Sequence, residues 1–139
     1  MAEKGLLDQV TVVPVDVMAA EHRQAAFLAK NPAGAGPALE LDDGTHLYDS
    51  RIILRYLNEV AGGSLYPASD WAMIRRESQA EGMIDASLLL RGEVTRPEEF
   101  QYQNFKDLQS RKIDNALDAL EAQAGNLNGM DAATIGTAC

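Results

Sequence analysis

Asp49 and Ser50 are the side chains with the clearest chemical use in this sequence, because they stand immediately ahead of a helical pattern. Carboxylate and hydroxyl oxygens at such a position accept hydrogen bonds from the first free N–H groups of a helix. Those N–H groups also favour a nearby anion. The apolar residues of the pattern are Ile52, Ile53, Tyr56, Leu57 and Val60, and Gly62-Gly63 follows them. From the residues alone, Asp49-Ser50 is interpreted as the cap of this helix.

The remaining candidates for chemistry are two histidines and one cysteine. His22 and His46 have no second ligand at metal-binding spacing, so they are interpreted as solvated surface residues and no metal site is predicted. Cys139 is the only cysteine and the last residue, which excludes an internal disulfide and a Cys-x-x-Cys motif. A chain of this kind is typical of a reducing cytoplasm.

Composition narrows the class of protein further. The chain has 139 residues with Lys+Arg 12 against Asp+Glu 21, a net charge of -9, which argues against a nucleic-acid partner. Hydrophobic residues at 46% and charged residues at 24% are globular values. Apolar runs such as Leu88–Leu90 are far shorter than the roughly 20 residues that span a bilayer. We therefore expect a globular cytoplasmic protein with no nucleic-acid and no membrane partner.

The elements that must position Asp49-Ser50 form a small α/β pattern. The pattern predicts the tail of a helix over Ala2–Leu7, a strand over Val10–Val15 and a short helix over Glu21–Lys30. Alternating runs on either side of Asp43-Gly44 predict a hairpin, in which both central turn residues need positive φ. The helix after Asp49-Ser50 completes the unit.

Beyond a short linker, only helical patterns recur. The first helix spans Asp70–Val94, the second follows Pro97 with Glu98-Glu99 in its first turn, and the third begins at Asp131. The residues available for burial on the first two helices are Trp71, Ile74, Met83, Ile84 and Leu88, then Ile113, Ala116, Leu117 and Leu120. The sequence thus predicts a strand–helix–hairpin–helix unit over residues 1–62, a linker over residues 63–69 and an all-helical unit over residues 70–139.

The segment NPAGAGPALELDDGTHLYDSRIILRYL, residues 31–57, resembles the second half of the thioredoxin-like domain of cytosolic glutathione transferases. The segments EGMIDASLLLRGEVTRPEE and KIDNALDALEA are similar to the first helices of that family's C-terminal domain, in a bacterial style. The resemblance runs from about Ala2 to Cys139 and implies an incomplete thioredoxin-like domain followed by a truncated helical domain. In the family, one more strand and most of a helix precede the segment matched at Ala2.

The resemblance implies a glutathione-binding role for four residues. Pro37 matches a cis proline that directs the backbone of Gly36 toward the cysteinyl part of glutathione, which docks like an added strand. Asp49 matches the carboxylate that pairs with the α-ammonium of glutathione, and Ser50 matches the hydroxyl that binds its α-carboxylate. Asp131-x-x-Thr134 matches the family's capping box with the two residue types exchanged, so Asp131 is still expected to cap its helix.

The resemblance also implies an activity, the conjugation of glutathione to small electrophiles, with glutathione as co-substrate, no permanently bound cofactor and a homodimeric assembly. The hydroxyl or thiol that stabilises the thiolate in relatives lies ahead of the matched segment, so no catalytic residue is assigned here. One alternative is a non-catalytic member that binds glutathione weakly or acts through protein contacts. A thioredoxin-type redox protein is disfavoured because no cysteine precedes Cys139.

The resemblance has a structural consequence as well. In relatives, the strand ahead of the matched segment pairs with the strand that corresponds to Val10–Val15, so Val10–Val15 is expected to lack this pairing partner.

Overall fold

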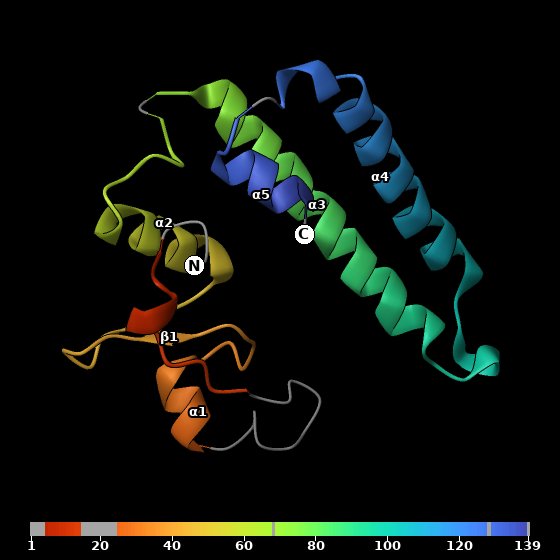
Figure 1. Cartoon of the computed structure of the whole chain (residues 1–139). Coiled ribbons are helices and arrows are strands. Elements are labelled where there is room, and N and C mark those ends of the chain that lie inside the picture. The colour runs from red at the N-terminus through yellow and green to blue at the C-terminus, as the bar shows by residue number, and fades with distance from the viewer. Residues whose placement is uncertain (1–4, 15–24, 68, 128, 139) are drawn as a thin grey trace. The chain divides into compact units, whose positions relative to one another are not determined.

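The computed structural model describes residues 5–14, 25–67, 69–127 and 129–138, with the backbone alone at Leu7 and Asn126. The chain divides into two compact units, Met1–Ser64 and Leu65–Cys139, and each is described by itself (Figure 1). Several expectations lie outside the described residues, namely those on residues 2–4, Val15, residues 21–24 with His22, and Cys139.

The first unit keeps the predicted order of helix, hairpin and helix from Ala25 onward, whereas the helix tail expected to end at Leu7 is replaced by a 3-10 turn that begins there. Its described elements are η2 (Leu7–Gln9), α1 (Ala25–Lys30), β1 (Leu39–Glu40), β2 (His46–Leu47) and α2 (Ser50–Val60). The predicted hairpin and the helix after Asp49 are confirmed. Gly62 and Gly63 follow α2 with φ of +88° and +62°, a backbone that glycine adopts without a steric penalty.

The hairpin has a different turn from the one predicted. Leu39 pairs with Leu47 and Glu40 with His46 in an antiparallel ladder. The Gly44 N–H donates to the Leu41 carbonyl at 2.9 Å, and the Leu41 N–H donates to the Thr45 carbonyl at 2.9 Å. Gly44 has a φ of +83°, but Asp43 does not have a positive φ. The loop is therefore of the three-residue kind with glycine last, and the expectation of two positive φ values was wrong.

The strand predicted over Val10–Val15 is absent from residues 10–14. Val10 has extended backbone angles, φ -125° and ψ 123°, yet the described sheet contains β1 and β2 alone. Val12 and Val13 are 69% and 71% exposed. An extended segment becomes a strand only when a neighbour accepts its ladder hydrogen bonds, and no described segment does so here.

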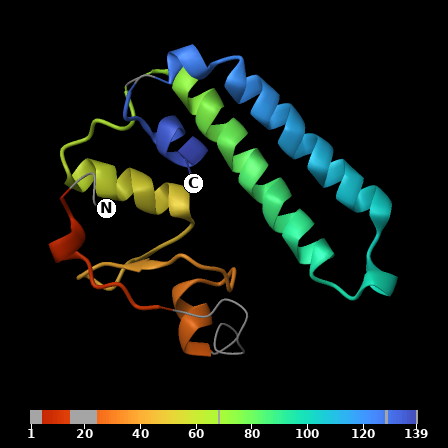
Figure 2. The same ribbon diagram turned by 45° about the vertical axis from the view of Figure 1, so that its right-hand side comes forward.

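The second unit is built on a helical hairpin. Its elements are α3 (Trp71–Val94), η4 (Glu98–Phe100), α4 (Gln103–Glu121), η5 (Ala124–Asn126) and α5 (Ala132–Ala138). Figure 2 shows α3 and α4 side by side, with α5 against α3. The Asp70 carboxylate caps α3 by accepting from the Met73 N–H at 2.8 Å. Glu98-Glu99 form a separate 3-10 turn, so α4 begins at Gln103 rather than in the turn after Pro97 as predicted.

The core of this unit uses small residues more than the sequence pattern predicted. Its buried apolar residues are Leu65, Met73, Ala80, Ala86, Leu120, Ala132 and Ala133. Trp71 and Leu88, expected to be available for burial, are 75% and 59% exposed. The side chains of α3 that are buried instead include Met73, Ala80 and Ala86. In the first unit, Leu6 is the one buried hydrophobic side chain among the described residues.

Asp131 caps α5, as expected from the exchanged capping box. Its Oδ1 accepts from the Thr134 N–H at 2.7 Å and from the Thr134 hydroxyl at 3.0 Å. Arg76 of α3 reaches its Oδ2 at 3.2 Å, a contact that the pattern did not predict. Burial raises the pKa of Asp131, but the Thr134 hydrogen bonds and the Arg76 charge outweigh it and leave the pKa below its ordinary value.

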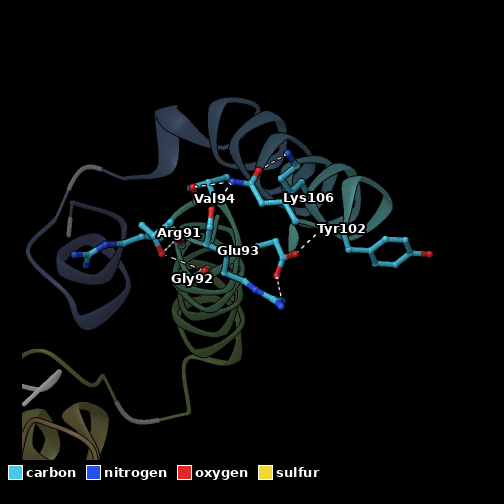
Figure 3. Close-up of polar contacts among 9 residues, drawn as sticks. Arg91, Gly92, Glu93, Val94, Tyr102 and Lys106 are labelled. Carbon is cyan, nitrogen blue, oxygen red and sulfur yellow. Dashed lines mark hydrogen bonds and ion pairs between the residues drawn. The ribbon is translucent and has the colours of Figure 1, made fainter. Parts of the chain in front are cut away.

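The connector between α3 and α4 is held by Glu93, which is buried. Its Oε1 accepts from the Tyr102 N–H at 2.6 Å and its Oε2 accepts from Arg96 at 3.2 Å. Gln101 donates to the Arg96 carbonyl at 2.8 Å and accepts from Lys106 at 2.8 Å. Figure 3 shows these bonds converging between the helices while the Tyr102 ring points away from them. The bond from Tyr102, opposed by burial and aided by Arg96, lowers the pKa of Glu93.

Candidate functional site

The four residues assigned to ligand binding lie at the open end of the β1–β2 hairpin. Pro37 and Asp49 are each two residues outward from the Leu39–Leu47 pair, on opposite strands. Gly36 comes directly before Pro37, and Ser50 comes directly after Asp49. All four are exposed. The hairpin is therefore the element that gathers two segments separated by a dozen residues in the sequence.

The Gly36–Pro37 peptide bond is cis, as the resemblance implied. The loop that leads to it is shaped by Asn31, which is 2% exposed. The Asn31 Oδ1 accepts from the Ala33 N–H at 3.0 Å, and its Nδ2 donates to the Ala35 carbonyl at 2.5 Å. Sequence reasoning missed Asn31. The available signal was an asparagine directly before a proline at the start of a Gly-rich loop, since asparagine bonds readily to the backbone of its own turn.

Asp49 is the cap of α2. Its Oδ1 accepts from the Arg51 N–H at 3.0 Å, and its Oδ2 lies 3.5 Å from the Arg51 guanidinium. The Tyr48–Asp49 peptide bond is also cis. The Ser50 hydroxyl is exposed and has no hydrogen bond to a described residue. The start of α2 thus carries the Asp49 carboxylate, the uncommitted Ser50 hydroxyl and the Arg51 cation. The sequence analysis did not predict a role for Arg51.

A second charged group lies on the hairpin. Lys30, the last residue of α1, binds the Glu40 carboxylate of β1. This bond and the lysine charge lower the pKa of Glu40. His46 Nε2 lies 3.8 Å from Glu40 Oε2, and His46 is half-buried rather than a solvated surface residue. These groups attach α1 to the hairpin. Within the described residues, no three metal-ligating side chains come together.

Comparisons with known proteins agree with the fold. The family model described as glutathione S-transferase, N-terminal domain, matches residues 1–60 of this sequence. Glutathione S-transferase 2 of Saccharomyces cerevisiae is 40% identical over 62 residues, 45% of this chain and 27% of the yeast protein. Glutathione S-transferase PM239X14 of Arabidopsis thaliana is 47% identical over 62 residues, 42% of this chain and 28% of its own. The aligned segments thus span little more than a quarter of these relatives.

A solved structure extends the likeness into the helical unit. The crystal structure of a glutathione transferase family member from Pseudomonas fluorescens Pf-5, with bound glutathione, is 37% identical. The match has a TM-score of 0.90 and covers 99% of this chain and 70% of that one. The chain therefore belongs to the glutathione transferase family. Its short sheet and helices are those of a thioredoxin-like N-terminal domain followed by a helical C-terminal region. Across the described residues, no helix has the length and hydropathy that crossing a membrane requires.

Proposed function

We propose that this chain binds glutathione through Gly36, Pro37, Asp49 and Ser50. The observation that carries the proposal is the exposed Ser50 hydroxyl, which has no hydrogen bond to a described residue and stands in the first turn of α2 beside the Asp49 carboxylate. A hydroxyl and a carboxylate placed together can bind the two ends of an amino-acid group, which is the γ-glutamyl part of glutathione.

The chemistry of this arrangement divides the ligand between the two residues. The Ser50 hydroxyl donates to the α-carboxylate, which also lies at the positive end of α2 beside the Arg51 charge. The Asp49 Oδ1 accepts from the Arg51 N–H at 3.0 Å, whereas Oδ2 makes only a longer contact of 3.5 Å to the Arg51 guanidinium. Oδ2 is therefore the oxygen that accepts from the α-ammonium. The backbone of Gly36, ahead of the cis bond to Pro37, pairs with the cysteinyl part as an added strand would.

The reaction that we propose on the family relationship is conjugation of glutathione, through its sulfur, to a small electrophile. The thiol loses its proton, and the thiolate forms a bond to the electrophilic carbon as the leaving group departs with its electron pair. No residue of this chain is assigned to stabilising the thiolate. We further propose that the protein works in the cytoplasm. We also propose that it is a homodimer, and the sedimenting mass would test this assembly.

Calorimetry with glutathione tests the binding site. Changing Ser50→Ala removes a charged hydrogen bond and is expected to weaken binding by roughly 1–3 kcal/mol. The control is Ser87→Ala, because the Ser87 hydroxyl is engaged with the Met83 carbonyl of α3 at 2.8 Å. A dissociation constant that Ser50→Ala leaves unchanged would reduce Ser50 to a helix position without a ligand role.

A conjugation assay with an aromatic chloride separates transfer from binding alone. Turnover above the uncatalysed reaction supports the transferase reading. Glutathione binding that depends on Ser50 without such turnover supports the alternative, a non-catalytic member of the family.

A further inference from the structure

Asn31 is a buried residue that holds the loop between α1 and β1 through four hydrogen bonds. Its backbone N–H donates to the Phe27 carbonyl at 2.8 Å, and its own carbonyl accepts from the Gly34 N–H at 2.9 Å. Its side-chain Oδ1 accepts from the Ala33 N–H at 3.0 Å, and its Nδ2 donates to the Ala35 carbonyl at 2.5 Å. One residue therefore fixes the loop from the inside as far as Ala35.

The bond to Ala35 also sets the direction of the next N–H group. The peptide bond from Ala35 to Gly36 is trans, and the C=O and N–H groups of a trans peptide point in opposite directions. Because the Ala35 carbonyl points toward the buried Asn31 amide, the Gly36 N–H points to the other side of the loop. Gly36 is exposed, and its N–H forms no hydrogen bond within the described part of the chain. The loop thus presents an oriented donor directly before Pro37.

We propose that Asn31 is a positioning residue for the glutathione site, because it holds the Gly36 N–H in the direction from which it donates to the carbonyl of the cysteinyl part. This inference rests on the proposed function, in which the backbone of Gly36 pairs with that part as an added strand would. Asn31 is buried and acts through the peptide that follows Ala35. Without the Asn31 amide this peptide can rotate, and ligand binding then has to order it.

Calorimetry with three ligands tests whether Asn31 acts through this one donor. γ-Glutamylcysteine lacks the glycine of glutathione but keeps the acceptor oxygen of the cysteinyl part, whereas γ-glutamylcysteamine lacks that oxygen as well. Asn31→Ala is expected to weaken the binding of glutathione and of γ-glutamylcysteine by about tenfold, as the loss of roughly one hydrogen bond would. The weaker binding of γ-glutamylcysteamine is expected to stay unchanged. An equal loss for all three ligands would mean a general disturbance of the site and would overturn the proposal.

Asn58 provides a matched control in the same unit. It is a buried asparagine in the last turn of α2, and its Oδ1 accepts from the Ser64 N–H at 2.9 Å. Asn58→Ala is expected to lower the thermal stability of the first unit, as Asn31→Ala does, but to leave the dissociation constant of glutathione unchanged. An equal loss of affinity in the two variants would reduce Asn31 to general support of the unit and would overturn its positioning role.

NMR of the parent chain tests the same donor even if Asn31→Ala does not fold. We expect the Gly36 amide proton to move downfield on addition of glutathione and of γ-glutamylcysteine, because a hydrogen bond to the cysteinyl oxygen forms. Addition of γ-glutamylcysteamine is expected to move it less. A Gly36 signal that stays in place at saturating glutathione would overturn the proposal.

The outcomes separate this inference from the proposed function on which it rests. A parent chain that does not bind glutathione would overturn both. Binding that Ser50→Ala weakens and Asn31→Ala leaves unchanged would overturn the positioning role of Asn31 alone.

Discussion

The contacts that stabilise the first compact unit differ in kind from those that stabilise the second. In the first, the described residues bury the single apolar side chain of Leu6, and shape comes from polar contacts such as those of Asn31 and the Lys30–Glu40 pair. In the second, Met73 and its neighbours form an apolar core between helices. Buried apolar area is the larger stabilising term in folding. Among the described residues, the helical unit therefore has the larger apolar core, while the first unit carries the candidate glutathione site.

The largest expected effect is on the apolar core of the helical unit. Met73 is fully buried, so Met73→Ala is expected to cost about 2–5 kcal/mol of unfolding free energy. Urea unfolding followed residue by residue through NMR amide signals measures this, with Leu88→Ala as the exposed control, within about 0.5 kcal/mol of the parent. We expect the midpoints of α3 and α4 to fall further than that of α2. An equal fall of the urea midpoints in both units would mean that they unfold as one cooperative body. The contrast between the two units in stability would then be wrong.

The next effect is at the Asp131 cap, which joins α5 to α3 through Arg76. Asp131→Ala is expected to cost about 1–2 kcal/mol, since it removes the cap and leaves Arg76 without this partner. Thermal unfolding measures the loss.

The same residue makes a prediction about pH. Because the pKa of Asp131 is lower when folded, its contribution is complete above the ordinary value near 3.8 and is lost as the pH falls below it. Asp131→Asn is therefore expected to weaken the acid dependence of unfolding in the helical unit. An acid limb that is unchanged in this variant would assign the dependence to other carboxylates.

A smaller effect is expected at the connector between α3 and α4. Glu93→Ala removes the acceptor of the Tyr102 N–H and the partner of Arg96, so the connector should open more often. Chymotrypsin cleavage after Phe100 or Tyr102, both exposed, is expected to accelerate. Glu99→Ala, an exposed neighbour, is the matched control, and equal rates for the two variants would show that the Glu93 bonds do not hold the connector.

The smallest effects come from two glycines, one in each unit. Gly44 has a φ of +83°, so Gly44→Ala is expected to cost about 1 kcal/mol by straining the hairpin turn. Gly92 lies in α3 with nothing within 4 Å of an added Cβ, so Gly92→Ala is expected to stabilise by about 0.5–1 kcal/mol. Thermal unfolding measures the stability change of each variant. Changes of the same sign would contradict the expectation that alanine strains the backbone at Gly44 and suits the helix at Gly92.

Local signals in the sequence predicted much of this fold. Asp43-Gly44 located the hairpin, Asp49 located the start of α2, and Asp131 located the cap of α5, because each acts through hydrogen bonds to residues nearby in the chain. The cis bond at Pro37 came from the family resemblance instead. The ligand roles of Gly36, Pro37, Asp49 and Ser50 remain predictions.

What the sequence did not predict depends on distant parts of the chain. Trp71 is apolar by type but exposed, because burial on α3 depends on which faces α4 and α5 cover. Val12 and Val13 have strand propensity but no described neighbour with which to pair. Gln109 is polar by type and buried, which no local pattern could indicate, since its surroundings come from α3.

The bonds that Asn31 makes to Ala33 and Ala35 all close within five consecutive residues. The shape of this bend is thus fixed by bonds between neighbours in the chain. The curvature of the chain ahead of Pro37 is therefore fixed by local bonds, so the proposed tripeptide ligand would meet a backbone edge that is already formed and would not have to be ordered on binding.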